Sequence, residues 1–198
     1  MTPSAGAAGP AELGGIVLTG GRAVRIQGAD KASIEVAGLT LLGRALDALV
    51  DVPEVVVVGE EVRTSRPVTF RREEPPGGGP AAGLLAGLSG FPRPPARVVV
   101  LAVDMPLVTA TTVRRLLQAA EEDGALLVDE NGRMQYLCAV YRTAALAAAA
   151  PAADEQHGLP MRRLVGGLRL TSVAEHPSES RDVDTWEDLL ALRARMEG

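Results

Sequence analysis

The chain has one cysteine, Cys138, among its 198 residues, which excludes an internal disulfide framework. No uninterrupted apolar stretch approaches the roughly 18 residues that a membrane-spanning helix needs. The opening residues 1–12 contain neither a basic segment nor an apolar run, so they do not match a signal peptide. We therefore predict a cytoplasmic protein that does not contact a membrane, with a flexible leader over residues 1–12.

An excess of basic residues is also absent. The 20 basic and 25 acidic side chains leave a net charge of −5, so the chain lacks the electrostatic footprint that sequence-independent binding to nucleic acid requires. Apolar residues make up 46% of the chain and charged residues 23%, a balance that argues against intrinsic disorder. The length fits one domain with one sizeable core, which we expect at residues 13–198.

Lysine is almost missing. Of the 20 basic residues 19 are arginine, and the remaining one is Lys31. The ammonium of lysine is a compact charge on a thin stem, so it can reach a phosphate through a narrow loop that a planar guanidinium does not pass. Because Lys31 lies in a glycine-rich stretch, it is a candidate phosphate ligand.

Short apolar runs that are continuous, and do not alternate with polar residues, predict buried strands at residues 14–18, 54–58, 98–102 and 125–128. Helical patterns lie between these runs, at residues 40–49, 81–88 and 109–122. This βαβ succession predicts an α/β fold with a doubly wound, mostly parallel sheet and helices on both faces. In such sheets ligands bind beyond the carboxyl ends of the strands, so the loops after Leu18 and Ala102 are the candidate site.

The remaining elements are less regular. Thr109 is the candidate N-cap of the third helix, and Cys138 is expected in the core because its neighbours are apolar. We expect an edge strand at residues 134–141 and further helices at residues 143–150, 161–165 and 185–196.

Two glycine-rich loops can bring backbone close to a ligand. In the first, Thr19, Gly20 and Gly21 follow a buried strand, and the cations Arg25 and Lys31 come soon after. Paired glycines allow backbone N–H groups to face anionic oxygens, so this loop predicts a phosphate cradle. The second loop, residues 74–83, runs from Glu74 through Gly79 into a helix of small residues, whose N-terminus attracts anions.

Acidic residues supply candidate metal ligands. Asp104 directly follows the third buried strand, where a carboxylate can hold Mg²⁺ together with substrate phosphate oxygens. Asp182 and Asp184 alternate just before the closing helix, and either can be a second metal ligand. Asp184 can equally be the N-cap of that helix.

Taken in order, these motifs resemble those of the nucleotidyltransferases that make molybdenum cofactor dinucleotides, and most closely the molybdenum cofactor guanylyltransferases. The motifs are Gly20-Gly21 with Arg25, Asp30-Lys31, Gly79-Pro80 with Gly83, Asp104-Met105-Pro106, and Asp184-Thr185 with Glu187-Asp188. The resemblance implies a Rossmann-like nucleotidyltransferase fold that uses Mg²⁺ to transfer GMP from GTP to the terminal phosphate of molybdenum-bearing molybdopterin, releasing pyrophosphate. It also implies transient contact with molybdoenzymes or their chaperones.

Matching positions extend the resemblance to residue roles. The nucleotide would be bound by Leu18, Thr19, Gly20, Gly21, Lys31, Glu74, Gly79 and Asp104. The catalytic residues would be Lys31, Arg25 and Asp104. The metal would be held by Asp104 and Asp184, and the acceptor by Asp182 and Asp184.

Departures from the family pattern leave other functions open. Asp182 and Asp184 replace asparagines, which resembles the cytidylyl-transferring relatives, whereas Gly20-Gly21 favours the guanylyl branch. One alternative is therefore a cytidylyltransferase for the same cofactor, or a guanylyltransferase for a small phosphorylated acid. The segment between Arg25 and Lys31 is also one residue longer than usual. A second alternative is accordingly a nucleotide-binding module without catalysis.

Overall fold

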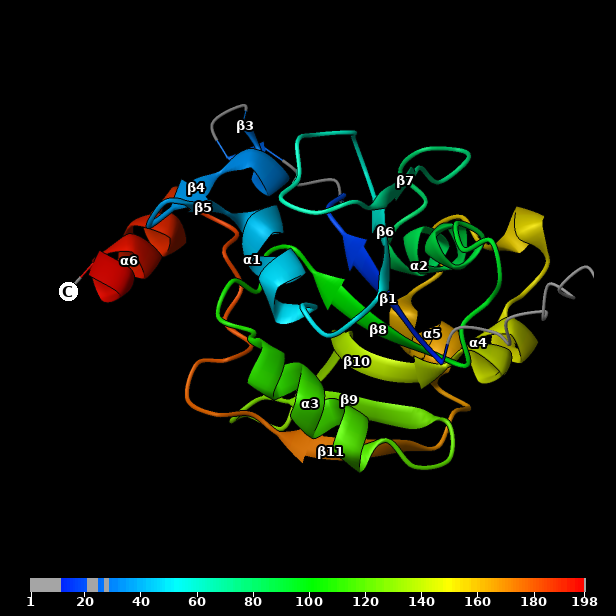
Figure 1. Cartoon of the computed structure of the whole chain (residues 1–198). Helices are drawn as coiled ribbons and strands as arrows, with labels where there is room; N and C mark the ends of the chain where they lie inside the picture. Colours follow the sequence, from blue (N-terminus) through cyan, green and yellow to red (C-terminus); the bar gives the residue numbers. More distant parts are fainter. Residues whose placement is uncertain (1–11, 21–24, 27–28, 198) are drawn as a thin grey trace, which may run out of the picture.

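The computed structural model describes residues 12–20, 25–26 and 29–197, and the predicted leader lies outside them except for Glu12. Seven strands form one sheet in the order β11-β9-β10-β8-β1-β6-β7 (Figure 1). The strands are β1 (Leu13–Leu18), β6 (Glu54–Val58), β7 (Thr69–Arg71), β8 (Arg97–Ala102), β9 (Gly124–Val128), β10 (Met134–Arg142) and β11 (Leu170–Ala174). Two small hairpins, β2 (Arg25–Ile26) with β3 (Ala29–Asp30) and β4 (Glu35–Val36) with β5 (Leu39–Thr40), follow β1.

The α-helices are α1 (Leu41–Ala48), α2 (Pro80–Leu88), α3 (Ala110–Ala119), α4 (Thr143–Ala149), α5 (Met161–Val165) and α6 (Trp186–Glu197). Two 3₁₀ turns, η1 (Lys31–Ser33) and η2 (Ala153–Glu155), join the set. The α/β class, the mostly parallel sheet and the predicted strands and helices are thus confirmed, with bounds that shift by at most three residues.

The expectation of an edge strand near residue 134 was wrong. β10 lies between β8 and β9 and pairs antiparallel with both, so it is the one strand of the described sheet that runs against the others. Its residues Cys138, Ala139, Val140 and Tyr141 have no exposed surface, which an edge strand would not allow. Burial also raises the pKa of the Cys138 thiol to about 12, so this residue is a core side chain, as expected.

Alternate residues of each central strand face opposite layers. On β1, Ile16 and Leu18 belong to the apolar cluster under α2, α4 and α5, whereas Val17 belongs to the cluster under α1 and α3 (Figure 1). Because both faces of the sheet are covered, both sets of side chains must be apolar, which explains the continuous apolar runs.

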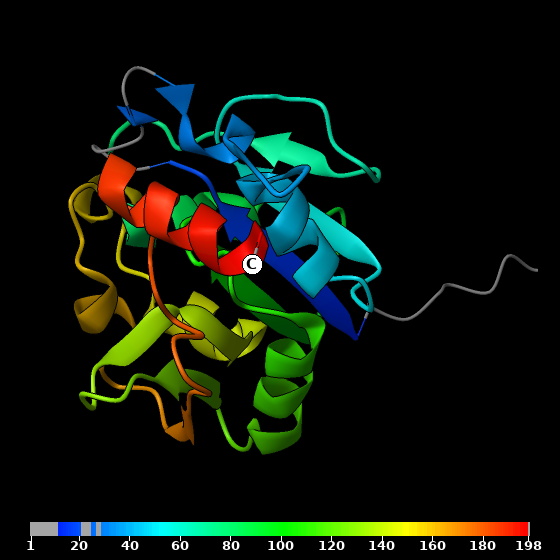
Figure 2. The same ribbon diagram turned by 90° about the vertical axis from the view of Figure 1, so that its left-hand side faces the viewer.

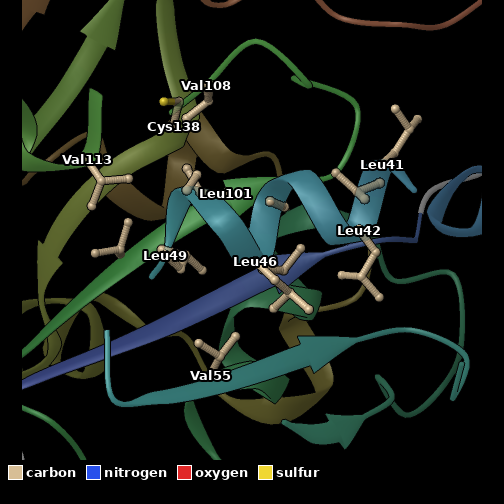
Figure 3. Close-up of a cluster of buried hydrophobic side chains, with 14 of the residues drawn as sticks. Leu41, Leu42, Leu46, Leu49, Val55, Leu101, Val108, Val113 and Cys138 are labelled. Carbon is tan, nitrogen blue, oxygen red and sulfur yellow. The ribbon is translucent and has the colours of Figure 1, made fainter. Parts of the chain in front are cut away.

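The layer on the α1 side contains most of the large aliphatic side chains. Leu41 and Leu46 of α1 and its C-cap Leu49 are buried against the sheet, and Leu101 of β8 and Val113 of α3 belong to the same cluster (Figure 3). Each such side chain contributes roughly 1.5–3 kcal/mol when it leaves water. The closing helix α6 adds its own leucines to this layer and lies beside β4 (Figure 2).

Local signals fix where the helices begin. Thr40 caps α1, because its hydroxyl accepts a hydrogen bond of 2.9 Å from the Gly43 N–H. Thr109 caps α3 as predicted, in a reciprocal arrangement with Thr112 in which each side chain accepts from the other residue's backbone N–H. α3 ends at Ala119, earlier than predicted, since Ala120 is extended and starts the turn into β9.

Candidate active site

The two loops that the sequence analysis singled out leave the sheet side by side. β1 and β8 are paired in parallel so that Leu18 lies opposite Ala102, and the Val103 N–H donates to the Leu18 carbonyl at 3.0 Å. The residues that follow, Thr19 and Asp104, therefore emerge at the same edge of the sheet. This edge is the one at which doubly wound folds bind ligands.

Thr19 anchors the first loop. Its backbone N–H and its hydroxyl both donate to the Val58 carbonyl, at 3.0 and 3.1 Å. The close approach depends on Gly59, whose φ is +156° and where an added Cβ would lie 1.8 Å from the Thr19 hydroxyl oxygen. Gly20 follows Thr19 into open space, since a Cβ there would meet nothing within 4 Å. Gly21 lies outside the described residues.

Lys31 is buried, with 5% of its surface exposed, although it is a cation. It begins η1 just after the β2–β3 hairpin, and its ammonium donates to Asp184 Oδ1 at 2.6 Å. The Asp104 Oδ2 oxygen lies 3.7 Å from the same nitrogen. Three predicted site residues from distant parts of the sequence are thus brought together around one charge, which supplies the partners that a buried ammonium requires.

Asp104 also fixes the backbone of residues 182–184. Its carbonyl accepts a hydrogen bond of 2.8 Å from the Val183 N–H, and Val183 itself is buried in the core. This contact holds residues 182–184 next to the end of β8. Sequence reasoning missed Val183 because a backbone bond between distant segments leaves no pattern in the residue types.

Burial raises the pKa of the Asp104 carboxyl above its usual range, Lys31 lowers it, and Asp184 and Asp182 raise it. A carboxylate whose negative charge is incompletely compensated favours an additional cation. The Asp104 side chain is 30% exposed, so it is open to such a ligand. The donor set therefore fits a hard divalent cation that takes one or two carboxylates and completes its shell with substrate oxygens.

A complete metal cage is not preassembled. In the described ranges no group of three or more histidine, cysteine, aspartate or glutamate side chains is arranged to hold a metal ion. Any cation at Asp104 would consequently need further oxygen ligands from water or a bound phosphate.

Asp184 faces Lys31, and the helix cap is supplied by Thr185. The Thr185 hydroxyl accepts from the Asp188 N–H at 3.1 Å, and Asp188 Oδ2 accepts from the Thr185 N–H at 2.9 Å. This arrangement leaves the Asp184 carboxylate for the ion pair, with 56% of its side chain exposed. Asp182 is exposed on the same segment.

The remaining predicted residues take no part in the ion pairs of Lys31 with Asp104 and Asp184, or are only partly described. Arg25 is paired with Asp30 in the β2–β3 hairpin, and its side chain lies outside what the structure describes. Gly79 precedes α2 with a φ of +86°, and its carbonyl accepts the first helical bond from Gly83.

Glu74 precedes a cis peptide bond to Pro75 and is exposed. It lines a cavity of about 340 Å³ on the outer side of α2, together with residues such as Arg72, Leu85 and His157. None of the residues that line this cavity belongs to the Lys31 cluster. The structure therefore does not bring Glu74 to the ion pairs, and its predicted role toward the nucleotide stays a prediction.

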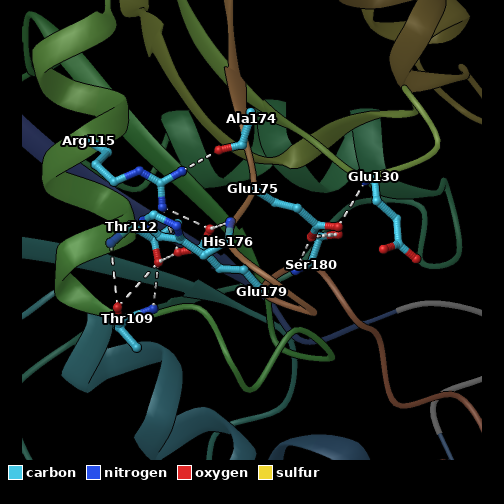
Figure 4. Close-up of polar contacts among 9 residues, drawn as sticks. All are labelled: Thr109, Thr112, Arg115, Glu130, Ala174, Glu175, His176, Glu179 and Ser180. Carbon is cyan, nitrogen blue, oxygen red and sulfur yellow. Dashed lines mark hydrogen bonds and ion pairs between the residues drawn. The ribbon is translucent and has the colours of Figure 1, made fainter.

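Glu179 is an acidic residue that the sequence does not single out. It is 7% exposed and bonds to α3 (Figure 4). A glutamate in a serine-rich turn gives no local signal of burial, so only the tertiary structure reveals it.

None of the helices in the described part of the chain combines the length and the apolar character that crossing a bilayer demands.

The chain is similar in sequence to proteins of one known family. The MobA-like NTP transferase domain matches residues 15–173. A probable molybdenum cofactor guanylyltransferase of Natronomonas pharaonis is 31% identical over 201 residues, which cover 93% of this chain and 98% of the relative. A probable molybdenum cofactor guanylyltransferase of Opitutus terrae is 37% identical over 142 residues, or 69% of this chain and 70% of the relative.

Solved structures agree in fold. Molybdopterin-guanine dinucleotide biosynthesis protein A from Archaeoglobus fulgidus has a TM-score of 0.70 at 19% identity, covering 93% of this chain and 98% of that one. A 2-C-methyl-D-erythritol 4-phosphate cytidylyltransferase from Thermus thermophilus has a TM-score of 0.67 at 22% identity, covering 92% and 98%. These likenesses establish the Rossmann-like nucleotidyltransferase fold. The family model that matches residues 15–173, together with the relative that is 31% identical over 93% of this chain, shows that the chain belongs to the family of MobA-like NTP transferase domains.

Proposed function

We propose that this chain transfers GMP from GTP to the terminal phosphate of molybdenum-molybdopterin, forming molybdopterin guanine dinucleotide and releasing pyrophosphate. The observation that carries the proposal is the Lys31 ammonium, held between Asp104 and Asp184 at the edge where β1 and β8 end. The relatives named molybdenum cofactor guanylyltransferase support this substrate pair over the cytidylyl and the non-catalytic alternatives.

In the proposed transfer the two substrates react directly, and the protein forms no covalent bond with either. A terminal phosphate oxygen of the acceptor attacks the α-phosphorus of GTP, a new P–O bond forms, and the bond to the β-phosphate breaks with pyrophosphate as the leaving group. The attacking phosphate is already an anion, so no general base is required. The barrier lies in aligning two anions and in stabilising the charge on the leaving pyrophosphate.

Different residues of the site would align the substrates and stabilise the negative charge. Lys31 and Arg25 neutralise the triphosphate, and the backbone around Gly20 and Gly21 holds it in line. Leu18 and Thr19 set the start of that loop, and Gly79 precedes α2, whose N-terminus would attract the anionic nucleotide. Glu74 contributes to nucleotide binding from its own loop.

Mg²⁺ is the cofactor that we propose, and Asp104 is its first protein ligand. Asp184 is the second carboxylate within reach of the same position, and it also serves the acceptor together with Asp182. When bound, the cation supplies Lewis-acid stabilisation of phosphate oxygens. The raised pKa of the Asp104 carboxyl, which reflects burial with incomplete compensation, supports this assignment.

The setting of the protein follows from the same proposal. We place it in the cytoplasm, where it would meet molybdoenzymes or their chaperones transiently, because the product is labile. We also propose that residues 13–198 act as one catalytic domain, which the two apolar layers on a shared sheet support.

Thermal unfolding with Mg²⁺ and each of GTP, CTP, ATP and UTP tests the nucleotide. A ligand at about 100 times its Kd adds roughly 2.7 kcal/mol to the free energy of unfolding, so binding is visible as a raised Tm. We expect a shift with GTP that is lost in Lys31→Ala and kept in Arg114→Ala, which removes an exposed arginine on α3. Pyrophosphate release that requires both GTP and molybdenum-molybdopterin completes the test. A shift with CTP alone would replace the guanylyl assignment.

A further inference from the structure

Glu179 is a buried carboxylate with a full set of partners. Arg115 Nη1 donates to both of its oxygens, at 3.0 and 2.9 Å, and the His176 N–H donates to Oε2 at 2.9 Å (Figure 4). The Thr112 hydroxyl also donates to Oε1. These contacts join a surface turn to α3 through charge-assisted hydrogen bonds.

The same contacts keep Glu179 ionised. Burial raises the pKa of Glu179, but the bonds from Thr112, the His176 N–H and Arg115, together with the charge of Arg115, outweigh it and lower the pKa below its usual value. Arg115 extends the connection by donating to the Ala174 carbonyl at the end of β11. Glu179 is therefore a fixed point of the turn.

The turn belongs to the segment that delivers Asp184. After β11 ends at Ala174, residues 175–184 leave the sheet and cross to the end of β8, where the Val183 N–H meets the Asp104 carbonyl. A second contact braces the start of this segment, because Glu175 Oε2 accepts from the Ser180 N–H at 2.8 Å. Among the described residues 175–184, Glu179 is the one charged side chain that is buried.

α3 is connected to both the Asp104 loop and the Asp184 segment. It begins after Thr109, five residues beyond Asp104, and its Thr112 has no exposed surface. The helix thus follows directly from the loop of Asp104 and also holds the segment of Asp184 through Glu179. This connection joins the same two segments as the direct hydrogen bond from the Val183 N–H to the Asp104 carbonyl.

We propose that Glu179 is a positioning residue for the acceptor: it locks residues 175–184 onto α3 and so fixes Asp184 against Lys31 and Asp104. The proposal rests on the proposed function, in which Asp182 and Asp184 contact the pterin phosphate. Glu179 itself touches neither substrate.

Glu179→Gln is the first variant, because the amide keeps the shape and an acceptor for Thr112 but loses the ion pair with Arg115. We expect the KM for molybdenum-molybdopterin to rise about tenfold, while the Kd for Mg-GTP measured without acceptor stays within about twofold. Arg115→Gln, which keeps the carboxylate and removes its charged partner, should likewise raise the KM for molybdenum-molybdopterin and leave the Kd for Mg-GTP within about twofold. It serves as the second variant if the first does not fold.

A double-mutant cycle separates positioning from general loss of stability. If Glu179 acts through Asp184, adding Glu179→Gln to Asp184→Asn should raise the acceptor KM by less than about twofold beyond Asp184→Asn alone. Independent structural damage would multiply the two effects. If the increase in acceptor KM in the double variant equals the product of the two single increases, the proposal is overturned.

The single tryptophan gives a readout that needs no acceptor. Trp186 lies two residues after Asp184 and is 40% exposed, so its fluorescence reports on the segment. We expect Glu179→Gln to raise the acrylamide quenching constant of Trp186 while the far-ultraviolet circular dichroism is unchanged. Asp51→Asn, which breaks the exposed ion pair with Arg114 on α3, is the matched control and should alter neither.

The two readouts distinguish the possible failures. Absence of GMP transfer in the unmodified protein, with altered Trp186 quenching in Glu179→Gln, would remove the proposed function and leave the positioning contact standing. Unchanged quenching and an unchanged acceptor KM in a folded Glu179→Gln protein would overturn the proposal itself.

Discussion

Lys31 and Asp184 are 153 positions apart in the sequence, yet the ammonium nitrogen of one lies 2.6 Å from a carboxylate oxygen of the other. This ion pair joins the loop that follows the first strand to the segment that precedes the last helix. In the proposed reaction the first binds the nucleotide and the second binds the acceptor. In this proposal the buried Lys31 ammonium therefore lies between the nucleotide-binding loop and the acceptor-binding segment.

Lys31→Arg should not preserve activity. The pocket around Lys31 is nearly closed to solvent, and a planar guanidinium cannot occupy the place of a compact ammonium between Asp104 and Asp184. We expect the rate of GMP transfer to fall by about a hundredfold or more, the scale seen when one preorganised charge-stabilising group is lost. Pyrophosphate release under saturating GTP measures it. Activity near that of the unmodified protein would show that a guanidinium can serve in place of the compact ammonium.

Asp104→Asn should abolish transfer and at the same time stabilise the fold. Burial raises the pKa of this carboxyl, so its ionised form opposes folding at neutral pH, and the neutral amide removes that cost. We expect the unfolding free energy to rise by about 1 kcal/mol, roughly 2–4 °C in Tm. Asp154→Asn, at an exposed acid of η2, is the control and should change neither property. A lowered Tm in Asp104→Asn would indicate that its contact with Lys31 dominates.

The contribution of Glu179 to stability should depend on pH. Its pKa in the folded protein lies below the usual value of 4.5, so the folded state holds the proton less tightly than the unfolded state. The stabilisation is therefore complete above that value and is lost as the pH falls through the lower pKa of the folded protein. Urea unfolding should show that Glu179→Gln costs most at pH 7 and progressively less in acid. A cost that does not vary with pH would contradict an ionised Glu179.

Gly59→Ala should damage the loop of Thr19. The new methyl group would collide with the Thr19 hydroxyl, at a backbone φ that other residues rarely adopt. We expect a loss of about 1–3 kcal/mol in unfolding free energy and weaker GTP binding, because the anchor to Val58 is displaced. Gly167→Ala adds the same group where nothing lies within 4 Å, so it should be close to neutral. Equal effects in both variants would mean that the alanine side chain, and not the collision, is responsible.

Much of the fold could be predicted from local pattern because both faces of the sheet are buried. The strands β1, β6, β8 and β9 have no charged residue apart from the first residue of β6 and of β8, and such continuous runs are distinctive. β7 and β11 lie at the two edges and are only half-buried, so their mixed sequences gave no comparable signal. The place of β10 in the strand order could not be predicted, because an apolar strand does not specify its neighbours.

The candidate site likewise has a part that could be predicted from the sequence and a part that could not. Lys31 and Asp104 were predicted from residue type and from their position after buried strands, and the structure brings them together. The hydrogen bond from Val183 to Asp104 and the anchoring of Glu179 on α3 are contacts between segments far apart in the chain. Such contacts depend on the complete tertiary structure, which composition and spacing do not encode locally.

The position of β10 between β8 and β9 also affects folding during synthesis. β1 is synthesised first but becomes central only when β8 pairs with it, and β8 keeps one open edge until residues 138–142 pair with it. A growing chain that stops short of residue 142 therefore presents an apolar, unpaired strand, which is a template for association with other chains. Because these pairings close long loops, folding should be slow for the size of the protein, and the ribosome must release most of the chain before the sheet can be completed.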